Sequence, residues 1–198
     1  MFDLAMRSRA LHAALADELR EEVGLDVGYR ACGHVETALD DAALAALRAR
    51  VAWQRDLGLR AEALDEAALR AREPALGPGF IGGAMFPDDG VVDPPRLVAG
   101  VAQAATRAGV SVRSGVTVRR VAVRGGRAVG VETDAGLLEA DTVVVCAGAW
   151  SNLVEGALPR ESLVKPARGQ VVELATRPVP IGSVVYAHGG YLVPRADG

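Results

Sequence analysis

The sequence has few of the residues that build metal centres, disulfide frameworks or nucleic-acid surfaces. Among its 198 residues are two cysteines and three histidines, and Lys165 is the only lysine. Neither a CxxC pair nor a cysteine–histidine cluster occurs, which argues against a zinc or iron–sulfur site. The formal net charge of −3 lacks the basic excess of a nucleic-acid-binding protein. Two cysteines far apart in the sequence are typical of reduced thiols in the cytoplasm.

Long apolar runs and several catalytic signatures are also missing. No apolar run approaches the roughly 20 residues that span a bilayer, and the charged N-terminal segment does not resemble a signal peptide. We therefore expect a cytoplasmic protein without a membrane span. The GxGxxG, GxxxxGK[ST], GxSxG and HExxH motifs are all absent. His12, His34 and His188 have no partner at metal-ligand spacing, so we expect a surface or structural role for each.

The apolar pattern predicts a mixed α and β chain with a helical first third. Leucines at every fourth position predict a helix over residues 2–23, closed by Gly24. Three further helices begin at aspartates that can cap free amide groups, namely Asp40 or Asp41, Asp65, and Asp93 before two prolines. For the helix after Asp93 we expect the buried face to consist of Leu97, Val98, Val101 and Ala105.

Short strands account for most of the remainder. They are expected at 27–35, 81–86, 110–113, 116–123, 128–133, 142–146, 170–174, 183–186 and 191–193. Gly125-Gly126 predicts a hairpin turn. The run 142–146 is almost purely apolar, which predicts a strand buried on both faces at the centre of an α/β sheet. The last three strands are expected to form a second, antiparallel sheet.

Four short segments form a recognisable series along the chain. In order they are Asp89–Pro94 at the start of a helix, the small-residue turn Ala147–Ser151, Pro166–Gln170, and Tyr191–Arg195. Their order and spacing resemble the D-amino-acid oxidase family of FAD-dependent enzymes, and within it the bacterial glycine oxidases. Phe2–Ser8 also resembles the helix that follows the first flavin-binding segment of that family, so the resemblance covers essentially the whole chain.

This resemblance implies an α/β (α+β) fold in which a FAD-binding domain and an antiparallel-sheet substrate domain are interleaved. It assigns 1–90 to a helical part of the substrate domain, 91–157 to the FAD-binding domain, and 158–198 to the antiparallel substrate part. The family's GxGxxG segment and its C-terminal portion, which carries a carboxylate-binding arginine, have no counterpart here. We therefore expect an incomplete fragment, lacking both ends, that binds FAD weakly and is inactive alone.

The resemblance also implies roles for individual residues. Val118 matches a strand residue whose backbone meets the adenine of FAD, and Ala147 with Gly148 matches the turn against the cofactor. Trp150 is expected to lie in the core or to pack beside that cofactor. Tyr191 matches the tyrosine that binds the substrate carboxylate. The Ala147-Gly148 turn and Tyr191 are therefore expected on opposite sides of one flavin-sized cleft.

Other side chains near these segments have two interpretations each. Tyr191 has the alternative of an ordinary strand tyrosine, and Tyr186 is a second candidate for substrate contact. Arg168 and Gln170 lie in the family's Arg-Gly-Gln strand, where a structural role and a ligand contact are both open. Arg195 could bind an anion or lie solvated at the end of a strand.

The implied activity is FAD-dependent oxidative deamination of a small amino acid or secondary amine in thiamine biosynthesis. Hydride would pass from the α-carbon to flavin N5, and oxygen would reoxidise the flavin with release of peroxide. A neutral amine needs no general base, which agrees with the lack of any evident His/Asp or carboxylate pair. A related flavin dehydrogenase, a sarcosine-type oxidase and a truncated, non-catalytic remnant stay open as alternatives, as does a homo-oligomer.

Overall fold

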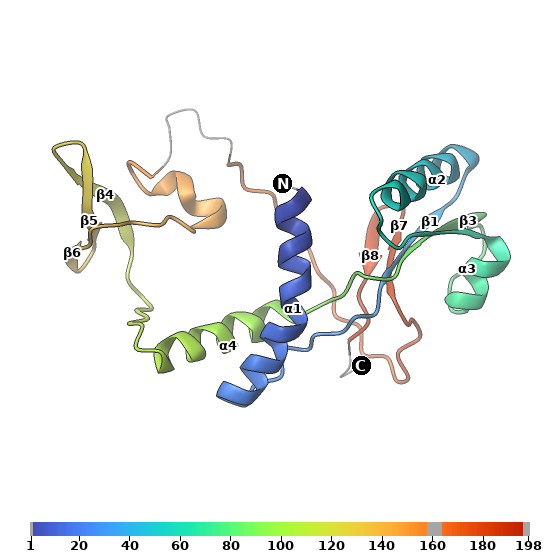
Figure 1. The fold of residues 1–198 in the computed structure, drawn as a ribbon, viewed down its shortest axis with the longest axis horizontal. Helices are drawn as coiled ribbons and strands as arrows, with labels where there is room; N and C mark the ends of the chain where they lie inside the picture. The colour runs from blue at the N-terminus through green and yellow to red at the C-terminus, as the bar shows by residue number, and fades with distance from the viewer. Residues whose placement is uncertain (1, 158–163, 196–198) are drawn as a thin grey trace. The chain divides into compact units, whose positions relative to one another are not determined.

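The computed structural model describes residues 2–157 and 164–195. Within them the chain forms two compact units, the first made of 1–110 and 174–198 and the second of 111–173. The predicted mixture of α and β structure is confirmed (Figure 1). The assignment of 1–90, 91–157 and 158–198 to substrate or FAD-binding parts stays a prediction. Among the described residues, no helix has the length and apolar character needed to cross a membrane.

The first unit contains four helices and a five-stranded sheet. Its elements are α1 (Phe2–Val23), β1 (His34–Ala38), α2 (Asp41–Asp56), β2 (Glu62–Asp65), α3 (Glu66–Arg72), β3 (Gly82–Phe86), α4 (Pro94–Arg107), β7 (Val184–Ala187) and β8 (Gly190–Leu192). The four predicted helices are all present. Three of them, α2, α3 and α4, begin at a local capping signal, because Asp40, Asp65 and Asp93 accept hydrogen bonds from amides three residues further on.

The sheet of the first unit has the strand order β2-β3-β1-β7-β8 (Figure 1). β1 and β7 run parallel, and the other neighbouring strands are antiparallel. His34 lies opposite Phe86 on one side and Val184 on the other, while Tyr186 lies opposite Tyr191. The predicted antiparallel pairing near the C-terminus is confirmed for β7 and β8. The expected strand over 27–35 starts only at His34, and β2 is an addition to the prediction.

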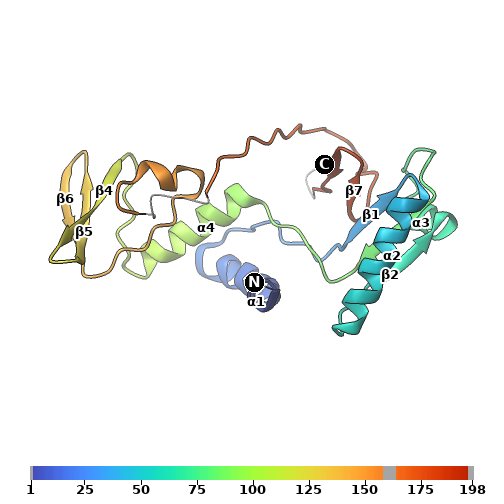
Figure 2. The same ribbon diagram turned by 90° about the horizontal axis from the view of Figure 1, so that it is seen from above.

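Helices α2 and α3 cover opposite faces of this sheet, and both lie beside its strands in Figure 2. One core cluster joins Val35 and Met85 to Leu64 and Leu69, the last from α3. A second joins Ala84 and Phe86 to Ala61 and to Val51 of α2. The alternation along β3 explains the division, because Met85 points to one face and its two neighbours to the other.

The contact between α1 and α4 corrects the predicted buried face of α4. Leu97 and Ala104 pack against the core of Ala16, Leu19 and Val27. Val98 and Val101 are instead 69% and 43% exposed. The reason is Gly100, which is buried and faces Leu19: a Cβ there would lie 3.3 Å from Leu19 Cδ1. Because Gly100 has no side chain, α1 packs against α4 on the face that contains Gly100.

The second unit contains a three-stranded antiparallel meander and one short 3₁₀ helix. Its elements are β4 (Val118–Arg124), β5 (Arg127–Thr133), β6 (Gly136–Glu139) and η1 (Gly148–Leu153). The predicted hairpin turn is confirmed, and Gly125 and Gly126 have φ values of 58° and 77°. Both are in the left-handed region that a two-residue type I′ turn requires.

Three predicted strands are wrong for the described residues. Segments 110–113, 142–146 and 170–174 have no strand structure, and Val144 and Val171 are 80% and 90% exposed. A strand exists only where its amide and carbonyl groups pair with a neighbour, and no described residue supplies that pairing. The apolar composition of 142–146 therefore predicted a buried strand, but it did not identify a neighbouring strand with which this segment could pair.

Candidate functional site

One face of the five-stranded sheet carries a row of aromatic rings. His34 stacks on Phe86 with ring centroids 4.7 Å apart, and it meets Tyr186 edge-on at 5.1 Å. Tyr186 in turn stacks on Tyr191 at 5.2 Å. Each contact joins residues on neighbouring strands whose side chains point to the same face, so the register of the sheet creates the row.

At its β8 end, the row of aromatic rings is exposed to solvent. Tyr186 and Tyr191 are 42% and 58% exposed, whereas His34 is only 8% exposed. No described residue hydrogen-bonds to the hydroxyl of Tyr191, so this hydroxyl is available to a ligand. The two candidate substrate residues are therefore adjacent, and both are accessible.

A cluster of charged side chains surrounds His34. Its Nδ1 lies 2.6 Å from a carboxylate oxygen of Asp89, and its Nε2 lies 3.1 Å from one of Glu36. Arg50 of α2 donates to Glu36 and lies over the Phe86 ring, 4.5 Å from its centroid. On the other side, Arg9 of α1 pairs with Asp89 at 3.4 Å.

This cluster shifts the pKa of its members. Burial alone would lower the pKa of His34, but hydrogen bonds to Asp89 and Glu36 outweigh burial and raise that pKa above its ordinary value of 6.5. The hydrogen bond to His34 lowers the pKa of Asp89, and the same ring lowers the pKa of Glu36. A protonated imidazole between two carboxylates is the consistent charge state.

The His34–Asp89 pair corrects one prediction. No His/Asp pair was evident in the sequence, because 55 residues separate the partners. Beside this pair, Asp88 forms an ion pair with Arg60. The available signal was weak: the β1–β3 register had to be known before these side chains could be placed together.

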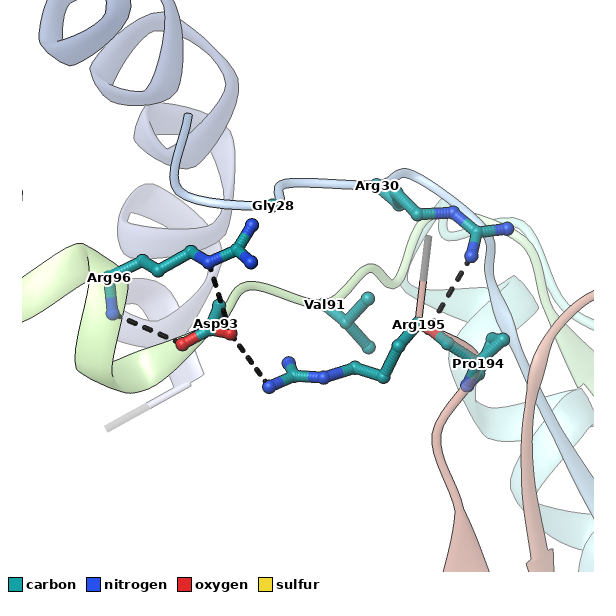
Figure 3. A pocket seen from close by; sticks show the side chains of 7 residues that line it. All are labelled: Gly28, Arg30, Val91, Asp93, Arg96, Pro194 and Arg195. Atoms are coloured by element: carbon teal, nitrogen blue, oxygen red, sulfur yellow. Dashed lines mark hydrogen bonds and ion pairs between the residues drawn. The ribbon is translucent and has the colours of Figure 1, made fainter. Parts of the chain in front are cut away.

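A small cavity lies where the end of β8 meets the start of α4 (Figure 3). It has a volume of about 200 Å³ and is lined by Gly28, Arg30, Val91, Asp93, Arg96, Pro194 and Arg195. Asp93 both caps α4, through the Arg96 amide at 3.1 Å, and pairs with Arg195 at 2.8 Å. Arg195 therefore forms an ion pair with Asp93, and both interpretations given for it, anion binding and a solvated strand end, stay predictions.

The residues predicted to meet FAD all lie in the second unit. Gly148 has φ +53°, and a Cβ added there would meet nothing within 4 Å. Trp150 and Val118 are 69% and 37% exposed. Tyr191 belongs to the first unit, so the placement of Tyr191 and Ala147-Gly148 across one cleft stays a prediction. Arg168 and Gln170 are exposed in an irregular segment.

These residues fit part of a flavin nucleotide. The open space at Gly148 and the exposed indole of Trp150 would suit an apolar, planar ring. The described residues contain no glycine-rich turn at a helix N-terminus, which is the usual site for a pyrophosphate. The described residues therefore include groups that would suit a flavin ring, but no phosphate-binding turn of this kind.

Comparisons with known proteins converge on one family. A family model described as FAD dependent oxidoreductase (DAO) matches residues 1–198. The chain is 34% identical over 203 residues to the bifunctional protein ThiO/ThiG of a Synechocystis strain, covering 100% of this chain and 28% of that protein. It is 32% identical over 196 residues to the glycine oxidase of Geobacillus kaustophilus, covering 98% of this chain and 52% of that protein.

A solved structure agrees with the sequence relatives. The crystal structure of glycine oxidase from Bacillus cereus superposes with a TM-score of 0.92 at 28% identity, covering 100% of this chain and 54% of that one. The chain thus spans about half the length of the glycine oxidases that it matches.

Proposed function

Because the chain belongs to the FAD dependent oxidoreductase (DAO) family, we propose that its protein carries out FAD-dependent oxidative deamination of a small amino acid or secondary amine. The observation that carries the proposal is the match of the entire chain to the fold of a glycine oxidase. We extend the proposal to a step of thiamine biosynthesis in the cytoplasm. The ThiO/ThiG relatives and the free thiols of Cys32 and Cys146 support this extension.

In this proposal the tyrosine end of the aromatic row binds the substrate. The Tyr191 hydroxyl donates a hydrogen bond to the substrate carboxylate, and Tyr186 supports the ring from behind. A small substrate suits this arrangement, because the contact consists of one exposed hydroxyl at a sheet edge rather than a deep apolar pocket.

The cofactor would lie against Val118, Ala147, Gly148 and Trp150, with its pyrophosphate bound by residues outside this chain. When bound, the flavin supplies the electron acceptor for oxidation of the carbon–nitrogen bond, and oxygen takes up the electrons as peroxide. The chain's own residues orient the amine. None of them has to remove a proton if the amine binds in its neutral form.

Expression of the complete open reading frame tests the proposal. We expect purified protein to contain flavin, seen in its absorption spectrum, and to release peroxide with glycine, sarcosine or proline. Amine turnover without peroxide would favour the dehydrogenase alternative. Protein that binds no flavin and oxidises none of these amines would contradict the proposal and favour a non-catalytic remnant.

Tyr191→Phe tests the assigned substrate contact. Loss of a hydrogen bond to a charged group costs at least about 1.5 kcal/mol, so KM should rise about tenfold while kcat changes less. Tyr29→Phe is the matched control, because Tyr29 packs beside the α1–α4 core. Equal KM values for both variants would remove Tyr191 from the site.

A further inference from the structure

We infer that His34 is a positioning residue, which holds the stacked Tyr186–Tyr191 pair in place for substrate. This inference rests on the proposed function, since it concerns the same site. His34 does not itself reach the exposed end of the row, and it acts through Tyr186.

The rest of the sheet restrains the two tyrosines only weakly. β8 is an edge strand of three residues, and all three are exposed. Few backbone hydrogen bonds therefore restrain Tyr191, and its recorded ring neighbour is Tyr186. Tyr186 is also more than one-third exposed. On its inner side it meets the buried ring of His34 at 5.1 Å, with an angle of 64° between the planes.

The His34 ring, in contrast, is fixed in its orientation. Both of its nitrogens contact carboxylates, Asp89 at 2.6 Å and Glu36 at 3.1 Å. Carboxylates only accept hydrogen bonds, so both nitrogens must donate, and only the protonated ring can do so. Rotation of the ring would break both bonds. Phe86 stacks on the ring and restrains it further.

The protonation state of the His34 ring affects how firmly this ring is held against Tyr186. Only the protonated ring can donate to both carboxylates, whereas the neutral ring can donate to one alone, so protonated His34 is held more firmly in its place against Tyr186 than neutral His34. The groups facing His34 come from every element around it: Glu36 from β1, Asp89 after β3, and Tyr186 from β7. Arg50 of α2 and Arg9 of α1 act on it through Glu36 and Asp89.

His34→Gln, made in the protein from the complete open reading frame, tests the inference. We expect KM for the amino-acid substrate to rise about tenfold, with kcat changed less than about threefold. In the wild type, KM should rise as pH increases and His34 loses its proton, and this dependence should be absent in the variant. His12→Gln is the matched control, because the His12 ring hydrogen-bonds the Ser8 carbonyl of its own helix and lies outside the row of aromatic rings.

A readout independent of activity accompanies the kinetics. Tyrosine ring signals in NMR spectra of labelled protein should include two that shift with the titration of His34, assigned through Tyr186→Phe and Tyr191→Phe. Both shifts should disappear in His34→Gln. If that variant does not fold, Glu36→Gln keeps the imidazole but removes one carboxylate, and the midpoint of the tyrosine shifts should fall.

The two readouts separate failure of the inference from failure of the proposed function. If the wild type oxidises no amine but its tyrosines follow His34, the proposed function is wrong and the positioning contact stands. If amine is oxidised but His34→Gln changes neither KM, its pH dependence nor the tyrosine signals, the inference is overturned.

Discussion

The carboxylate of Glu73 accepts a hydrogen bond from the backbone amide of Ser183, 2.8 Å away, although 110 residues separate them in the sequence. The second carboxylate oxygen accepts the amide of Gly182 at 2.9 Å. Glu73, directly after α3, is 1% exposed. A buried carboxylate thus fixes the segment that leads into β7, and β7 carries Tyr186.

Glu73→Ala should lower the free energy of unfolding by about 3 kcal/mol, because it removes two hydrogen bonds to a charged group and leaves two amides without that partner. Urea unfolding of the purified protein measures this loss. The control is Glu66→Ala, whose exposed side chain pairs only with Arg70 one turn along α3, and which should cost less than about 1 kcal/mol. Equal losses would show that the Glu73 bonds contribute little.

Gly83→Ala should destabilise the sheet by about 3 kcal/mol through forced separation of strands. A Cβ on Gly83 would lie 2.3 Å from the backbone oxygen of Glu36 on β1. Gly77→Ala is the control, since its Cβ would meet nothing within 4 Å and its backbone φ is ordinary; this change should stay within about 0.5 kcal/mol. Thermal unfolding followed by circular dichroism compares the two, and similar melting temperatures would contradict the strand spacing.

Asp93→Ala should cost about 2 kcal/mol, since it removes both the cap of α4 and the ion pair with Arg195. Asp40→Ala removes a cap alone, from α2, and should cost about 1 kcal/mol. Denaturant unfolding of both variants, with Arg195→Ala and the Asp93→Ala/Arg195→Ala double mutant to complete the cycle, isolates the pair. Strict additivity in that cycle would mean that Arg195 contributes nothing through Asp93.

The stability contributed by the His34 cluster should depend on pH. The pKa of His34 is raised above 6.5, so its contribution is complete below about pH 6.5 and is lost as the pH rises through the raised value. The pKa values of Glu36 and Asp89 are lowered from 4.5 and 3.8, so their contribution is complete above about pH 4.5 and is lost in stronger acid. We therefore expect the His34 cluster to stabilise the folded protein most between about pH 4.5 and about pH 6.5.

Unfolding of the wild type and of His34→Gln, measured from pH 4 to pH 9, checks this dependence. The difference in free energy between the two should be largest near pH 5 to 6 and should shrink toward pH 9. A constant difference over this range would show that the charge of His34 is irrelevant to folding.

Helix positions were predictable from the sequence because their signals are local. Asp40, Asp65 and Asp93 each cap a helix through an amide three residues away, so the signal and its effect lie within one turn. The lack of strand structure at 142–146 was not predictable in this way. The apolar residues of this segment are compatible with a central strand, but pairing depends on residues distant in the sequence.

The contacts of the candidate site also divide into those with a local signal in the sequence and those that depend on distant residues. The pairing of Tyr186 with Tyr191 follows from a short hairpin turn at Gly189, which has φ +86°, and such a turn is a local signal. The contact of His34 with Asp89 depends instead on the register of β1 against β3.

The division of the chain has a consequence for its synthesis. Residues 111–173 form their own unit, while the sheet of the other unit joins β1 to β7; Thr37 and Tyr186, which hydrogen-bond across this junction, are 149 residues apart. On the ribosome, β1 must therefore wait with an open edge until the inserted unit has been translated, whereas β4, β5 and β6 can pair as soon as they emerge.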